Sequence, residues 1–208
     1  MTIYKRKLVL LISAFVLTTI IGTITHELGH YAVARIMGYK AKMHFAKTSW
    51  GKRSYEKKTI CKNERLFITS GGVAQTVFTG LVGLYLIFKR REKISTNGLK
   101  PIDWVSVFLS LFWLREPFNL FSFVFDKIIY PSNGSYFGGD EFKLSKMMGL
   151  HEGTFSIVLG VLGLVIPLYV FLKIIPTKLK VTFMIGGFVG CLTGYVLWIK
   201  IMGLVLMP

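Results

Sequence analysis

The chain has 208 residues, of which 52% are hydrophobic, and its mean hydropathy is +0.55. A soluble domain of this size does not need five long apolar runs, whereas a polytopic membrane protein does. The formal net charge of +16 does not indicate nucleic-acid binding, because the basic residues lie mainly between the apolar runs, where loops touch anionic lipid headgroups. The two cysteines, Cys61 and Cys191, have neither metal-ligand nor disulfide spacing, and we interpret both as structural.

The first apolar run covers about 8–37. Its basic start is similar to a signal peptide, but the run continues well past the usual length and has no convincing small-residue cleavage site. We therefore expect a retained membrane helix that ends near Gly38. Four ionisable residues interrupt the run, and groups of this kind are costly at membrane depth: His26, Glu27, His30 and Arg35.

The motif His26-Glu27-Leu28-Gly29-His30 lies inside this run. Residues four apart share one face of a helix, so both histidines can offer a ring nitrogen to one metal ion. Glu27 lies beside them, where it can accept a proton from water that the metal activates. A chance motif would have to bury all three groups with no metal to satisfy them, which is expensive. The motif therefore predicts a zinc-hydrolase centre in a membrane.

A polar, basic segment, 39–65, follows the first span. Apolar and polar residues alternate along 41–45, and Trp50-Gly51-Lys52 is typical of a turn, so we expect a β-hairpin. Its edge could pair with an unwound substrate strand. The alternative is a basic loop that lies on lipid headgroups.

The second span covers about 66–88, and we expect a short basic loop over 89–100. Small residues in the span let helices approach closely, and ordinary tight packing explains most of them: Gly71, Gly72, Ala74, Gly80 and Gly83.

The third span covers about 102–129 and carries Arg115, Glu116, Pro117 and Asn119 near its middle. Pro117 removes a backbone hydrogen bond and is expected to kink the helix. Arg115 and Glu116 are explained equally well by an ion pair at the break and by the wall of a polar cavity.

A loop over 130–153 is expected to lead into a short amphipathic stretch, and two apolar spans without recognisable chemistry follow at about 154–175 and 181–206. The sequence thus predicts an all-α polytopic membrane protein with about five transmembrane helices and a small β-hairpin after the first. We expect one integral membrane domain over 1–208, with a catalytic core at about 8–150.

A transmembrane helix with this motif and a basic hairpin after it resembles the site-2 protease family of intramembrane zinc metalloproteases. That family carries a Gly-Pro-x-x-Asn turn in its second span, and this chain has Gly71-Gly72-Val73-Ala74-Gln75 there, with Gly for Pro and Gln for Asn. The resemblance covers roughly 8–150. It implies that the hairpin and Asp140 lie on the cytoplasmic side and the N-terminus outside.

The third metal ligand is where the chain departs from the family, which uses an Asp in an Asn-x-x-Pro run ending in Asp-Gly. Asp140 is favoured, because two glycines before it permit an irregular turn and the amphipathic stretch after it resembles small family members. Asp126 ends a run from Asn119 that lacks the proline. Glu141 and His151 are further alternatives.

The resemblance and the motif together imply a metalloendopeptidase that hydrolyses peptide bonds in or near transmembrane segments. Zn²⁺ is held by His26, His30 and Asp140, with Glu27 as general base. Asn119 or Gln75 donates a hydrogen bond to the substrate backbone or the oxyanion. The expected partners are a membrane-protein substrate and the lipid bilayer, in the cell membrane. The alternative is an inactive membrane scaffold or a metal-binding or transport protein.

Overall fold

The computed structural model describes residues 3–53, 61–130 and 135–208. Within these ranges, five helical segments are long and apolar enough to cross a membrane. A single antiparallel pair of strands follows the first of them in the described part of the chain. The predicted class, an all-α polytopic membrane protein with a small hairpin, is confirmed. The five segments are Lys5–Ile36, Lys62–Asn97, Pro101–Ile129, Thr154–Lys173 and Thr177–Leu206.

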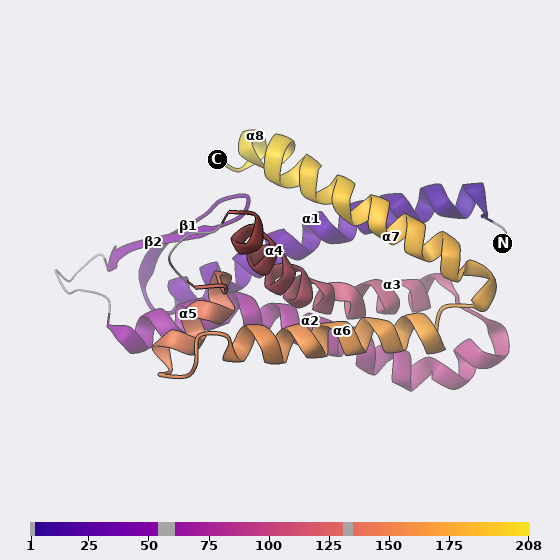
Figure 1. Cartoon of the computed structure of the whole chain (residues 1–208), viewed down its shortest axis with the longest axis horizontal. Helices are drawn as coiled ribbons and strands as arrows, with labels where there is room; N and C mark the ends of the chain where they lie inside the picture. The colour runs from indigo at the N-terminus through magenta and orange to yellow at the C-terminus, as the bar shows by residue number, and fades with distance from the viewer. Residues whose placement is uncertain (1–2, 54–60, 131–134) are drawn as a thin grey trace.

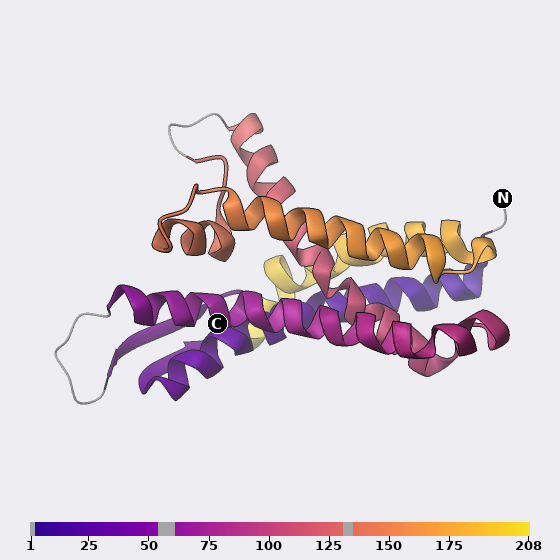
Figure 2. The ribbon, with the colours of Figure 1, turned by 90° about the horizontal axis from the view of Figure 1, so that it is seen from below.

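The helices run back and forth along the long axis of the molecule (Figure 1). The N-terminus lies at one end, and the hairpin and the short helix α5 (Gly139–Met147) lie toward the other. Helices α1 (Lys5–Ile36) and α2 (Lys62–Asn97) pack side by side (Figure 2). The hairpin after α1 and the short helix α5 therefore lie toward the same end of the bundle.

Helix α1 follows from the first apolar run, with bounds within a few residues of those predicted. Its 32 residues span about 48 Å at 1.5 Å each, which exceeds the roughly 30 Å of a hydrocarbon core. The helix must therefore tilt or protrude. It ends where expected, because Gly38 has a φ of 84°, a left-handed conformation that glycine adopts without strain.

The hairpin consists of β1 (Tyr39–Met43) and β2 (Thr48–Arg53), with Ala41 opposite Trp50. The predicted turn at residues 50–52 is wrong: the chain reverses at 44–47, and residues 50–52 belong to β2. The reason is packing, since Trp50 covers a small core formed by residues of α1, β1 and α2. The end of the expected second strand, at 54–55, lies outside the described residues.

Helix α2 is longer than predicted and continues through most of the expected loop, as far as Asn97. The polar composition of this stretch predicted a loop, but two of its residues make contacts that stabilise the helix. Ile94 is buried in the main core, and Arg90 forms an ion pair with Asp103 of the next helix. The loop is reduced to the residues around Gly98, whose φ is 72°.

The third span is broken, as expected, but not at the proline itself. A 3₁₀ turn, Leu111–Leu114, separates α3 (Pro101–Ser110) from α4 (Arg115–Ile129), which turns away from the bundle (Figure 2). Pro117 lies in the first turn of α4, where its missing N–H leaves no helical hydrogen bond unmade. The break therefore precedes Pro117 by about one turn.

The last two spans are α6 (Thr154–Lys173) and α7 (Lys180–Tyr195), the latter extended by a π-helical stretch, Val196–Met202, and by α8 (Gly203–Leu206). Helix α7 packs on α1 through glycines that contact its side chains and backbone. Many large apolar side chains outside the core are exposed, which suits contact with lipid: examples are Val9, Leu10, Phe78, Phe188 and Val205.

Candidate metal centre

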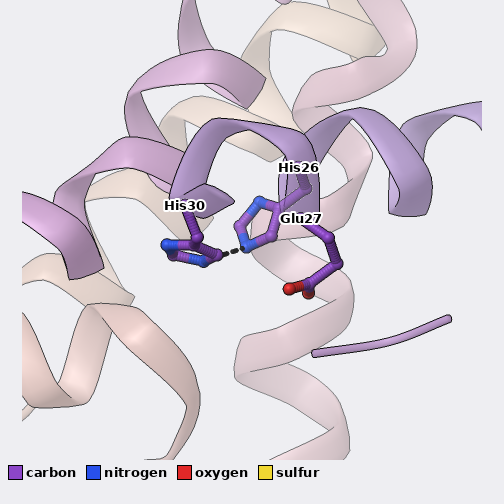
Figure 3. A group of neighbouring side chains, drawn as sticks. All are labelled: His26, Glu27 and His30. Atoms are coloured by element: carbon purple, nitrogen blue, oxygen red, sulfur yellow. Dashed lines mark hydrogen bonds between the residues drawn. The ribbon is translucent and has the colours of Figure 1, made fainter. Parts of the chain in front are cut away.

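His26 and His30 lie on one face of α1 with their rings directed at each other, and Glu27 lies beside them (Figure 3). All three are buried, with exposed fractions of 0%, 4% and 4% for His26, Glu27 and His30. The two Nε2 atoms are 3.2 Å apart. The spacing of four residues thus has the predicted consequence, two imidazole nitrogens at one point.

The opposite nitrogen of each ring has a partner on α2. His26 Nδ1 lies 2.9 Å from Thr76 Oγ1, and His30 Nδ1 lies 2.8 Å from the carbonyl oxygen of Ile68. A carbonyl can only accept, so the contact with Ile68 needs the His30 proton on Nδ1, an atom that the backbone N–H of Gly72 also approaches at 3.2 Å. The same tautomer of His26 allows Thr76 to accept. Each Nε2 then presents a lone pair toward the other, as in metal sites where a second group orients each histidine.

Asp140 comes to the same point from α5. Its Oδ2 lies 3.3 Å from His26 Nε2 and 3.0 Å from His30 Nε2. The other oxygen, Oδ1, lies 3.0 Å from Nζ of Lys143. Asp140, the residue favoured as third ligand, is thus the carboxylate that contacts both histidines among the described residues.

The three facing atoms form a triangle with edges of 3.0, 3.2 and 3.3 Å. Ligands of a tetrahedral zinc ion at about 2.0–2.1 Å are separated by roughly 3.3 Å, so the triangle has the size of one face of such a site. Two lone pairs and a carboxylate oxygen pointing at one another repel unless a cation lies between them. The residues present fit a zinc ion with one coordination position open.

The position of Asp140 follows from the start of α5. Gly139 has a φ of 74°, and this turn places Asp140 in the first helical turn, where a negative charge is favoured. Burial alone would raise the pKa of Asp140. The Lys143 ammonium, 3.0 Å from Oδ1, acts against burial by lowering the pKa of Asp140 and favouring its charged form. The carboxylate is therefore in the form that binds metal.

The other proposed third ligands lie elsewhere. Asp126 is exposed on α4. Glu141 is buried, but it accepts a hydrogen bond of 3.4 Å from Asn119 Nδ2 rather than facing the histidines. His151 accepts one from the backbone N–H of Gly153.

Glu27 is held by the hairpin. The hydroxyl of Thr48, the first residue of β2, lies 3.1 Å from Glu27 Oε2 and 2.9 Å from its backbone oxygen. A carboxylate oxygen of Glu27 and one ring nitrogen from each of His26 and His30 all lie within 4.8 Å of one another. The Glu27 carboxylate therefore lies beside the point where the two imidazole nitrogens meet.

The two predicted hydrogen-bond donors are not at the metal triangle. Asn119 binds Glu141, as described above, and also lines a chamber that reaches Thr76. Gln75 donates to Thr79 on its own helix, at 2.9 Å. Their predicted roles with substrate stay predictions.

Close helix contact brings α2 to the histidines. A Cβ atom on Gly29 would collide with the backbone oxygen of Gly71, so α1 and α2 touch backbone to backbone. A Cβ atom on Gly72 would lie 2.7 Å from His26 Nε2 and closer still to His30 Nε2. Tight packing was expected to explain most of these glycines, and Gly72 in addition leaves room for the two histidine rings.

Gly72→Ala is therefore expected to lose most bound zinc. The added methyl group would occupy the position from which both Nε2 atoms reach the metal. The measurement is zinc content of the purified protein by atomic absorption. Gly22→Ala is the control on the metal-binding helix, since its Cβ would meet Phe112 at 3.8 Å, an ordinary contact. Equal zinc content in both variants would contradict the assignment.

No protein-family model, curated protein or solved structure matches this chain. The functional interpretation therefore depends on the geometry of the site.

Proposed function

We propose that this chain is a zinc-dependent intramembrane endopeptidase of the site-2 protease type, acting in the cell membrane. The observation that carries the proposal is the triangle of His26 Nε2, His30 Nε2 and Asp140 Oδ2, with the Glu27 carboxylate beside it. Zinc bound there would supply a Lewis acid that polarises a peptide carbonyl and makes water a better nucleophile.

The chain's own residues account for the proton transfers. Glu27 accepts the proton of the attacking water and delivers it to the leaving amine as the C–N bond breaks. Thr48 holds the Glu27 carboxylate in place through its hydroxyl. Ile68 and Thr76 keep the imidazoles oriented. Burial of the histidines and Glu27 limits the access of bulk water.

The surroundings favour a substrate from the membrane over a soluble one. The histidines lie on a helix with an apolar sequence of membrane-spanning length. A transmembrane substrate must unwind before cleavage, and its freed backbone groups need new partners. The hairpin is next to Glu27, and each strand of a two-stranded sheet keeps one edge without a strand partner in the described chain. Such an edge suits pairing with an unwound segment.

The deciding experiment is cleavage of a panel of single-span membrane peptides by the purified, zinc-loaded chain. We expect cleavage within or near the apolar segment, inhibited by a chelator and restored by zinc. A protein that holds zinc yet cuts no peptide in detergent or in bilayers would favour a scaffold or metal-transport protein instead.

Thr48→Val should lower kcat about tenfold and leave KM and zinc content nearly unchanged. Valine keeps the volume of threonine but cannot hydrogen-bond Glu27, and a lost hydrogen bond to a charged group is worth roughly one power of ten. Steady-state kinetics on one cleaved peptide measure this. Thr48→Ser, which keeps the hydroxyl, should retain most activity. Equal losses in the two variants would show that the methyl group matters rather than the hydroxyl.

A further inference from the structure

A chamber of about 760 Å³ lies beside the metal centre. Its walls come from α1, the break between α3 and α4, and α7 with its π-helical extension. Most of the lining is apolar, with aromatic residues on three sides: Phe15, Phe112, Phe118, Phe121, Phe188, Tyr195 and Trp198. Thr76, which contacts His26, also lines it, so the chamber extends to the metal centre.

Arg115 alone carries a charged side chain among the described residues that line the chamber. Its Nε atom is buried and has no hydrogen-bond partner in the described part of the chain. Among the described residues, no hydrogen bond joins Arg115 to the neighbouring Glu116. Glu116 instead lines a separate small pocket with Glu141 and Ser156, on another side of α4. Arg115 thus lies in a cavity wall, but the cavity is mainly apolar rather than polar as expected.

Several other polar groups of the chamber have hydrogen-bond partners within the protein. The hydroxyls of Thr18, Thr19 and Thr23 each donate to a carbonyl four residues earlier on α1. The indole N–H of Trp198 donates to the backbone oxygen of Phe45. Arg115 is thus the charged group of the chamber lining, and its buried Nε has no hydrogen-bond partner among the described residues.

An arginine in a membrane-embedded, apolar chamber is costly unless an anion pairs with it. Arg115 lies close enough to His26 and Glu27 for its charge to act on both. The chamber runs from Arg115 to Thr76, which contacts His26, so a molecule long enough to fill it would place an anion at Arg115 and extend to the metal centre. The apolar walls require the rest of that molecule to be hydrophobic.

Resting on the proposed protease function, we propose that the chamber selects apolar substrate segments that carry one acidic side chain, whose carboxylate pairs with Arg115. Arginine binds a carboxylate through two parallel hydrogen bonds, which gives both affinity and orientation. Arg115 is then a specificity-determining residue, and the acidic residue of the substrate marks the segment to be cleaved.

The test measures binding separately from cleavage. The full chain carrying Glu27→Gln is loaded with zinc in lipid nanodiscs and titrated with fluorescent peptides of about 20 apolar residues. The peptides are identical except for Glu, Gln or Lys at the centre. We expect the Glu peptide to bind at least about tenfold more tightly than the Gln peptide, and the Lys peptide to bind most weakly.

Arg115→Gln should remove this preference, and Arg115→Glu should reverse it toward the Lys peptide. Arg35→Gln is the matched control, since Arg35 is an exposed arginine on α1, and it should keep the preference. Equal binding of the Glu and Gln peptides to the parent overturns the proposal even if an Arg115 variant fails to fold. So does a preference that survives Arg115→Gln.

A lipid is the other anion source, and dodecyl phosphate is its probe. Binding of dodecyl phosphate that depends on Arg115, with no preference among the peptides, would assign the site to a lipid headgroup and overturn the proposal. A Glu preference in a protein that cleaves nothing would instead overturn the protease function and leave the binding site standing.

Discussion

Glu27→Gln is expected to abolish cleavage of every membrane peptide and to leave the zinc content of the protein unchanged. Glutamine has nearly the shape of glutamate, so packing beside β2 survives. Its amide cannot accept the proton of the attacking water, and general-base catalysis is typically worth about 10²–10⁴-fold in rate. Cleavage assays and atomic absorption on the same preparation measure both effects.

His26→Ala and His30→Ala serve as the comparison, because both should lose zinc and activity together. Retained cleavage in Glu27→Gln would be the most damaging result, since proton acceptance by Glu27 is the step that gives the motif its function here.

Asp140→Asn is expected to weaken zinc binding by more than about 100-fold. Groups that only orient the ligands typically account for about 10–100-fold in metal affinity, so a direct ligand should exceed that. The amide is isosteric with the carboxylate but lacks its charge. Competition with a chromogenic chelator gives the zinc affinity, and circular dichroism confirms that the helices remain.

Asp126→Asn is the matched control, with the same chemical change on an exposed residue of α4. It should bind zinc like the parent protein. Loss of zinc in Asp126→Asn with retention in Asp140→Asn would exclude the triangle seen here.

The spans were predictable because a run of about 20 apolar residues has few alternatives to a membrane helix. The ends of the helices were not predictable where residues distant in the sequence stabilise a helix that continues through a polar stretch. Ile94 and Arg90 lie in a stretch that composition marks as a loop, yet one is buried and the other pairs with Asp103. The hairpin turn was misplaced for the same reason, because Trp50 packs on α1 and α2 rather than turning the chain.

The candidate site was predictable where its residues are local. His26, Glu27 and His30 need only the helical repeat to meet. The two glycines before Asp140, Gly138 and Gly139, favoured it as the third ligand, although Asp126 and Glu141 were alternative candidates.

Thr48 and Thr76 carried no signal in the sequence. They reach Glu27 and His26 across 21 and 50 residues, and only the packing of the hairpin and α2 on α1 makes those contacts. Arg115 was noticed, but the chamber that it faces exists only once α1, α4 and α7 are assembled.

The separation of the metal ligands also bears on biosynthesis. His30 and Asp140 are 110 residues apart, and three of the five spans end before α5 begins. During translation, a chain that has not yet inserted its third span holds the histidines and Glu27 but lacks the carboxylate. Under the proposed protease function, a nascent chain would be inert toward neighbouring membrane proteins until the segment that carries Asp140 has been made and folded. In that proposal, the late synthesis of Asp140 delays hydrolysis until three of the five spans have been made.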